Sequence, residues 1–207
     1  MKNLLIILTT VIFNLVSGQR DHGPVQEACS SYHKFPLRTF NSLPEEPCNY
    51  LKDKNNELPA FEGTWKGTWD NKIVFITFKK ISKIFNSNLK YYSDYLIGKY
   101  KILDSNGNVL TESVKGNILF DTMNIADYKA KIKGGKFKKT NDKYSLTYVD
   151  SDLCYKSGFI EISFTDTSKT QLNWNLNLGS NMISSDCAYY NTDFPDVLPA
   201  QITLIKQ

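Results

Sequence analysis

The chain has 207 residues, and its formal net charge of +4 comes from 25 Lys and Arg against 21 Asp and Glu. Hydrophobic residues make up 41% of the sequence, which is enough for a packed core and excludes a disordered chain. The charge is too modest to predict a nucleic-acid-binding protein, and the length favours one domain with an appended segment.

Residues 1–18 have the pattern of a secretory signal peptide. Lys2 precedes an apolar run from Leu4 to Val16, and the small residues Ser17 and Gly18 follow. The run is shorter than the roughly 20 residues of a membrane-spanning helix, so we expect cleavage after Gly18 and no membrane span. An uncleaved short anchor is the alternative. The sequence has no Asn-x-Ser/Thr glycosylation motif, which favours a bacterial source.

Residues 19–60 form a lead-in that contains five of the seven prolines and no run with helical or strand periodicity. We expect this lead-in to be irregular and to lie against the folded domain. All four cysteines lie beyond the signal segment, and an even number of cysteines in an exported chain predicts two disulfides.

From Phe61 the pattern changes to short runs rich in β-branched and aromatic residues. The segment FEGTWKGTW, residues 61–69, alternates aromatic residues and glycines with polar residues, which predicts a strand whose rings face a core. The next strands are expected at 72–80 and 94–103, and Asn106 and Gly107 predict a tight hairpin turn after the second of these.

Five further strands are expected at 128–132, 144–148, 160–164, 171–178 and 201–206. Alternation along the strands after the first predicts which residues face inward. They are Val74, Ile76, Phe78, Leu96, Gly98, Tyr100, Ile102, Tyr144, Leu146, Tyr148, Ile160, Ile162, Phe164, Leu172, Trp174, Leu176 and Leu178. Asn173, Asn175 and Asn177 are expected to face water.

This order of strands predicts an all-β fold, an antiparallel up-and-down barrel of about eight strands over residues 61–207. Pairing the last strand with the first would remove both exposed sheet edges. In such a meander the connections that hold Cys154 and Cys187 emerge at the same end, so we expect these two to pair and Cys29 to pair with Cys48. Four cysteines allow three connectivities, and a link between Cys29 and Cys154 would reject this prediction.

The sequence offers few groups for catalysis. His22 and His33 are the only histidines, and both lie in the lead-in, so neither a catalytic triad nor a zinc site is predicted. Asp150 and Asp152 would suit a glycosidase pair, but acids at a strand end are more often turn or cap residues. Residues 104–112 lack the glycine position and spacing of a calcium loop. We expect no enzymatic activity, no metal and no cofactor.

The candidate ligand-binding residues are the large aromatic side chains expected inside the barrel: Trp65, Trp69, Tyr100, Tyr148 and Trp174. They would line a pocket for a small apolar or ring-shaped ligand. Because an eight-stranded barrel is only just wide enough to be filled by its own side chains or to hold one small ligand, a filled core is the alternative.

A dense basic run is interpreted as a solvated outer strip, with binding of anionic lipid or polysaccharide as the alternative. Its members are Lys129, Lys131, Lys133, Lys136, Lys138, Lys139 and Lys143.

Several segments carry a family resemblance: YLKDKNNELPAFEGTWKGTW, FITFKK, DYLIGKYKILDSNGNVL, DKYSLTY, DLCYKSGFIEISFTD, KTQLNW, SSDC and LPAQITLIKQ. Through them, residues 51–207 resemble an uncharacterised family of small secreted bacterial proteins, a domain of unknown function. This resemblance implies no activity, cofactor or catalytic residue. Gly63, Thr64 and Trp65 are also similar to the first strand of calycin-like barrels such as lipocalins and avidins. Lys206 lies on the last strand, where lipocalins place an arginine over that tryptophan.

The sequence therefore predicts an exported, non-enzymatic and monomeric β-barrel, secreted or periplasmic, that binds a small hydrophobic ligand or an envelope component. The alternative is a protein-interaction or inhibitor-like module that acts through the loops at 150–157 and 179–199. An empty interior pocket would favour the first hypothesis, and a filled core with exposed apolar loop residues would favour the second.

Overall fold

The structure is a computed structural model that describes residues 29–38, 46–86, 89–110, 130–138 and 141–207. The chain divides into two units, Met1–Ser30 and Ser31–Gln207, and the second unit holds all the described strands. The predicted signal peptide lies outside the described residues.

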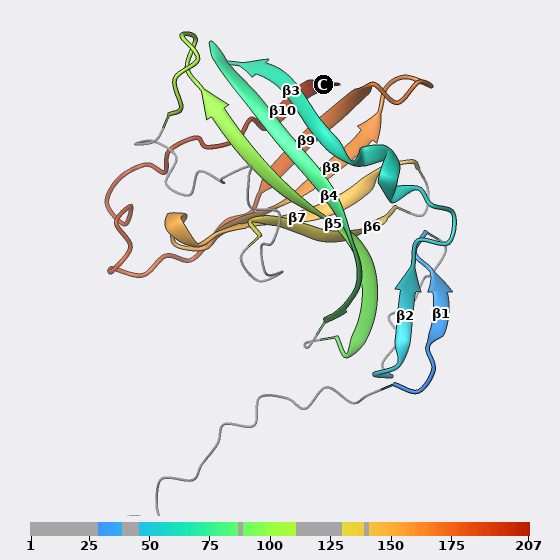
Figure 1. The fold of residues 1–207 in the computed structure, drawn as a ribbon. Coiled ribbons are helices and arrows are strands. Elements are labelled where there is room, and N and C mark those ends of the chain that lie inside the picture. The colour runs from blue at the N-terminus through green and yellow to red at the C-terminus, as the bar shows by residue number, and fades with distance from the viewer. Residues whose placement is uncertain (1–28, 39–45, 87–88, 111–129, 139–140) are drawn as a thin grey trace, which may run out of the picture. The chain divides into compact units, whose positions relative to one another are not determined.

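Eight antiparallel strands close into a barrel (Figure 1). They are β3 (Gly63–Trp69), β4 (Lys72–Asn86), β5 (Tyr91–Leu103), β6 (Ile132–Phe137), β7 (Tyr144–Asp150), β8 (Lys156–Phe164), β9 (Gln171–Leu178) and β10 (Gln201–Lys206). Each strand pairs with the next in sequence, and β10 closes the barrel on β3 by placing Lys206 opposite Trp65. The predicted up-and-down barrel and its closure are confirmed.

Two more strands lie in the lead-in, where the sequence predicts only irregular chain. β1 (His33–Pro36) pairs in parallel with β2 (Asn49–Lys52), and β2 pairs in parallel with the start of β5. A short 3-10 turn, η1 (Leu58–Phe61), then leads into β3, so Phe61 precedes the first barrel strand instead of opening it. β1 is exposed at its first two residues and β2 is buried at its first three, so neither strand alternates and the sequence pattern does not reveal them.

β4 and β5 are longer than the sequence predicts, because they continue past the barrel wall. β4 was expected to end at Lys80 but runs to Asn86, and the register shifts between Ile81 and Ile84. Lys83, inside this irregularity, has a φ of 56°. A bulge bends and twists a strand. Residues 81–86 and 91–95 therefore form a two-stranded extension, here called the ribbon, which curves away from β6 (Figure 1).

The predicted hairpin after β5 is confirmed. The amide of Gly107 donates to the carbonyl of Asp104 at 3.1 Å, and Leu103 pairs with Val109. Gly107 has a φ of 85°, a conformation that glycine adopts without strain.

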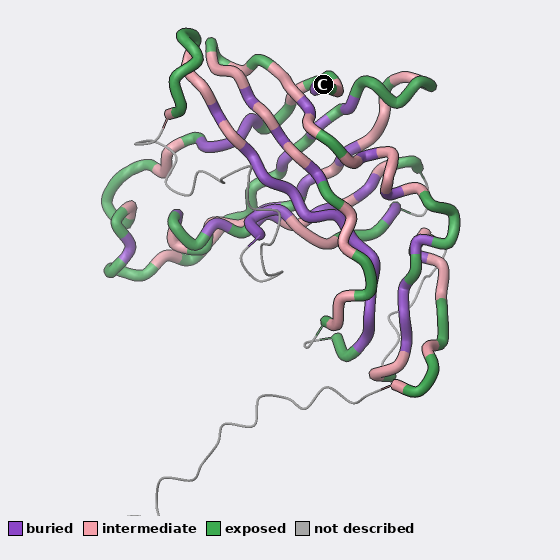
Figure 2. Tube along the Cα trace, viewed as in Figure 1, coloured by how far each residue is buried: buried purple, intermediate pink, exposed green. Residues whose placement is uncertain are grey.

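Buried residues lie along most of the barrel strands (Figure 2), and their hydrophobic side chains pack into one core. Nearly all the residues predicted to face inward are buried, and Asn173, Asn175 and Asn177 are exposed as predicted. Phe164 and Leu178 are the two large side chains that depart from the prediction: Phe164 is half-buried and Leu178 is exposed. Each is the last residue of its strand, where the barrel wall no longer covers it.

Candidate ligand-binding groove

The five aromatic residues predicted to bind a ligand are mostly core residues. Trp65, Tyr100 and Tyr148 are completely buried and Trp174 is 2% exposed, whereas Trp69 at the end of β3 is half-buried. The indole N–H of Trp65 donates to the carbonyl of Phe61 at 2.8 Å, and that of Trp174 donates to the carbonyl of Pro199 at 2.9 Å. Both indole N–H groups are therefore already hydrogen-bonded within the protein. Ligand binding by the five rings stays a prediction.

Lys206 on β10 lies over the ring of Trp65. Its Nζ lies 5.2 Å from the centroid of the Trp65 ring and donates to the carbonyl of Ala60 at 3.1 Å. A cation over an indole face is attracted by the ring quadrupole. This contact ties η1 to the first and last strands of the barrel.

A buried charge cluster that sequence reasoning missed lies where β7 ends. Asp150 is completely buried and accepts hydrogen bonds from the hydroxyls of Tyr148 at 3.0 Å and Tyr100 at 3.2 Å. Its carboxylate also contacts the Nζ of Lys131 at 2.7 Å. The Asp152 amide donates to the same carboxylate at 3.0 Å, so the interpretation of Asp150 as a cap is confirmed.

Lys131 contradicts the prediction of a solvated outer lysine strip. Its side chain is 10% exposed and lies between Asp150 and Asp152, each at 2.7 Å. β6 begins only at Ile132, so strand alternation does not decide where Lys131 points. Farther along the strip, Lys138 and Lys143 both pair with Glu161. Lys129 and Lys139 lie outside the described residues.

Several interior tyrosines hold their protons more tightly than tyrosines in water. Burial raises the pKa of Tyr144, and burial followed by the charge of Asp150 raises the pKa of Tyr100. The pKa of Tyr148 is raised by burial, then by Tyr100 and Asp150. All three hydroxyls should stay neutral while the barrel is folded.

Alkaline pH is therefore expected to unfold the barrel steeply. Below the ordinary tyrosine pKa of about 10, these three residues contribute fully to the stability of the fold. Above that pH the tyrosines of the unfolded chain lose their protons before those of the folded barrel, so this contribution is lost as the pH rises. In an absorbance titration, Tyr100, Tyr144 and Tyr148 should ionise only together with the loss of the β-sheet circular dichroism signal. Ionisation of all 12 tyrosines near pH 10 with the fold intact would refute this expectation.

A groove of about 460 Å3 lies between the ribbon and the β6–β7 hairpin, where β5 parts from β6. Its apolar lining comes from the lead-in, the ribbon and its tip, and strands β7 and β8: Leu37, Leu51, Ile84, Phe85, Leu89, Tyr91, Tyr95, Leu146 and Phe159. Its polar side chains are Asn86, Ser93, Lys133, Lys136, Ser145 and Thr147. Two other cavities of about 340 and 390 Å3 have walls richer in polar and charged groups.

Buried carboxylates fix the ribbon that forms one wall of the groove. Asp94 on β5 accepts from the Tyr50 hydroxyl at 2.5 Å and from the amides of Asp53 and Lys83 at 3.0 and 2.9 Å. Asp53 in turn contacts the Nζ of Lys80 at 2.9 Å. These bonds join β2, β4 and β5 through side chains as well as through the sheet, so the wall is preorganised. An aspartate inside the aromatic run YYSDY is the sequence signal for this network, since a buried charge needs partners.

The opposite wall contains a bulge of two glycines. Gly134 and Gly135 have φ values of 70° and 115°, and the register shifts between Lys133 and Lys136. A Cβ at Gly135 would lie 1.4 Å from the carbonyl oxygen of Ser145, so no larger residue fits there. Beside Gly134 the space that a Cβ would take is open, so a ligand in the groove can approach the backbone there.

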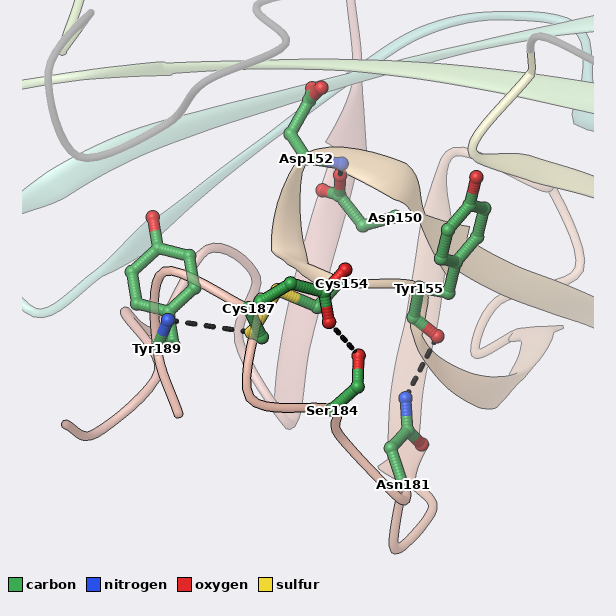
Figure 3. The surroundings of a disulfide bond; sticks show 9 residues. Asp150, Asp152, Cys154, Tyr155, Asn181, Ser184, Cys187 and Tyr189 are labelled. Carbon is green, nitrogen blue, oxygen red and sulfur yellow. Dashed lines mark hydrogen bonds between the residues drawn. A yellow bond between two sulfur atoms is a disulfide. The ribbon is translucent and has the colours of Figure 1, made fainter. Parts of the chain in front are cut away.

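The structure joins Cys154 to Cys187, the predicted pair, and links the β7–β8 connection to the 179–199 segment (Figure 3). Asn181 donates to the carbonyl of Tyr155 at 2.8 Å and strengthens the same junction. Cys29 and Cys48 are also disulfide-bonded, and no cysteine is free. Two disulfides are typical of proteins in oxidising compartments, such as the periplasm or the cell exterior.

The described residues contain no group of three or more His, Cys, Asp or Glu side chains placed to hold a metal ion. His33 is an exposed residue of β1, and His22 lies outside the described ranges. Within the part of the chain that the structure describes, no helix is long and apolar enough to span a membrane.

The fold and the groove define a class of protein: a closed, eight-stranded, up-and-down β-barrel with a hollow outside the barrel wall. Residues 1–207 match the model of a family of unknown function, DUF6705, and the chain belongs to that family. No curated protein and no solved structure matches the chain.

Proposed function

We propose that the protein is an exported, non-enzymatic, monomeric binding module that holds a small apolar ligand, such as an apolar component of the cell envelope, in the groove beside the ribbon. The observation that carries this proposal is the groove itself. Its volume of about 460 Å3 lies within the roughly 300 to 1,000 Å3 of small-molecule sites, and its lining is mainly aliphatic and aromatic.

The packing of the barrel favours the groove over the interior as the binding site. A ligand inside the barrel would have to displace completely buried side chains such as Trp65 and Tyr148. Such displacement would also break the hydrogen bonds from Trp65 to Phe61 and from Tyr148 to Asp150. The groove offers apolar surface without that cost.

Filling the groove should abolish binding. Ser145 lines the groove from β7 and is half-buried, so Ser145→Trp is expected to occupy the hollow without entering the barrel core. Titration with the neutral fluorescent probe N-phenyl-1-naphthylamine should show binding to the wild-type protein and at least a tenfold weaker affinity for the variant.

Asn173→Trp is the matched control, because Asn173 is exposed on β9 and does not line the groove. This variant should bind the probe as the wild type does. The proposal would be refuted if the wild type and Ser145→Trp bound the probe with equal affinity, or if the wild type did not bind it.

Exposed apolar side chains near the Cys154–Cys187 disulfide favour a second candidate function, binding of another protein through the loops. Tyr155 is 70% exposed, Tyr190 is 49% exposed and Met182 is fully exposed. With a filled core, these are the features expected of the loop hypothesis. A photocrosslinking residue at position 182 should then capture one defined protein in the native host, whereas the same residue at the exposed position 173 should not.

A further inference from the structure

We infer that the ligand of the groove is a single-chain amphiphile with an anionic head group, whose chain lies against the ribbon and whose head group lies at Lys136. This inference rests on the proposed function and adds the chemical class of the ligand.

Charge is the first observation behind the inference. Lys133 and Lys136 are the charged residues among the described lining of the groove, and no aspartate or glutamate is among them. Lys136 is exposed and makes no ion pair with a described residue. By contrast, Lys131, Lys138 and Lys143 of the same basic run are paired with carboxylates. The Lys136 ammonium therefore complements an anion.

The local geometry gathers polar groups at one place. Lys136 pairs with Ser145 across the β6–β7 hairpin, and Lys133 pairs with Thr147. Side chains of directly opposed residues lie about 5 Å apart at Cβ, so the Lys136 ammonium and the Ser145 hydroxyl can reach one head group. Gly134, between the two lysines, leaves open space beside the backbone at the same place. Ammonium and hydroxyl groups both donate to carboxylate or phosphate oxygens.

The apolar lining lies mostly on the other side of the groove. Ile84, Phe85, Tyr91 and Tyr95 come from the ribbon, and Leu51 comes from β2. This surface suits an alkyl chain, which gains free energy from every methylene removed from water. One apolar wall opposite one cationic rim matches a molecule with a chain at one end and a charge at the other.

The inference is tested by competition with the bound N-phenyl-1-naphthylamine. Dodecanoate, 1-dodecanol and dodecyltrimethylammonium share one chain length and differ in charge. Dodecanoate should displace the probe at about fivefold lower concentration than dodecanol, since a partly exposed ion pair contributes up to about 1 kcal/mol. The cationic amphiphile should be the weakest competitor, and inorganic phosphate without a chain should not compete.

Two lysine variants test whether Lys136 causes the preference for dodecanoate. Lys136→Gln should remove most of the preference for dodecanoate over dodecanol and leave dodecanol binding unchanged. Lys79→Gln, which removes an exposed charge on β4 outside the groove lining, should retain the full preference.

The outcomes separate this inference from the proposed function. Equal displacement by all three amphiphiles, or displacement by phosphate alone, overturns the amphiphile inference while binding in the groove stands. If neither the probe nor any of the amphiphiles binds, both the amphiphile inference and the proposed function are overturned.

Discussion

Asp150→Ala is expected to lower the free energy of unfolding by about 3 to 5 kcal/mol, the cost of breaking a buried ion pair by removing one partner. The substitution deletes the acceptor shared by the Lys131 ammonium and the hydroxyls of Tyr100 and Tyr148. The two hydroxyls are completely buried, so water does not replace the lost acceptor and they are left with a desolvation cost, while Lys131 keeps only the half-exposed Asp152 as a partner. Urea denaturation followed by circular dichroism measures the change.

Asp152→Ala is the matched control for Asp150→Ala. The Asp152 side chain also contacts Lys131 at 2.7 Å but is 40% exposed, so its loss should cost about 1 kcal/mol or less. Asp150→Asn should fall between the two, because it keeps one acceptor oxygen and loses the charge. Equal urea midpoints for Asp150→Ala and Asp152→Ala would show that the buried cluster does not stabilise the barrel.

Trp65→Ala is expected to destabilise the barrel by about 3 to 5 kcal/mol, the range for truncating a buried tryptophan. The indole is completely buried and packs against Phe164 with ring centroids 6.1 Å apart. Its loss also removes the hydrogen bond to Phe61 and the ring under Lys206. The change should appear in the urea midpoint and in a lower melting temperature.

Two further variants show how much of the destabilisation comes from the indole N–H donor and how much from the position of the ring in the core. Trp65→Phe keeps a ring and loses the N–H donor, so it should cost clearly less than the alanine variant. Trp69→Ala removes a half-buried ring that packs against the core and lies 4.5 Å from the Lys72 Nζ, and it should cost less still. If Trp69→Ala proved as costly as Trp65→Ala, the assignment of Trp65 to the core and Trp69 to the rim would be wrong.

The barrel was predictable from the sequence because most of its strands have one face in the core and one in water. Residues 171–178 show this most clearly, with Leu172, Trp174 and Leu176 buried and Asn173 and Asn175 exposed. The pairing of Cys154 with Cys187 followed from the same meander. These features depend on local alternation and strand order, which a single sequence contains.

The groove was not predictable, because it depends on where a strand leaves the barrel. All ten residues from Tyr91 to Tyr100 are buried on both faces, so this part of β5 shows no alternation that would mark the start of the ribbon. The groove walls come from segments far apart in sequence, from Leu37 to Phe159. The network of Asp53 and Asp94 that holds the ribbon is equally non-local.

The central claim, that the groove holds a small ligand, is tested most directly by native mass spectrometry of the wild type and Ser145→Trp, both purified from the natural source. The wild-type protein should carry a bound small molecule, and Ser145→Trp should have the mass of the polypeptide alone. An equal adduct on both proteins, or none on either, would contradict the claim.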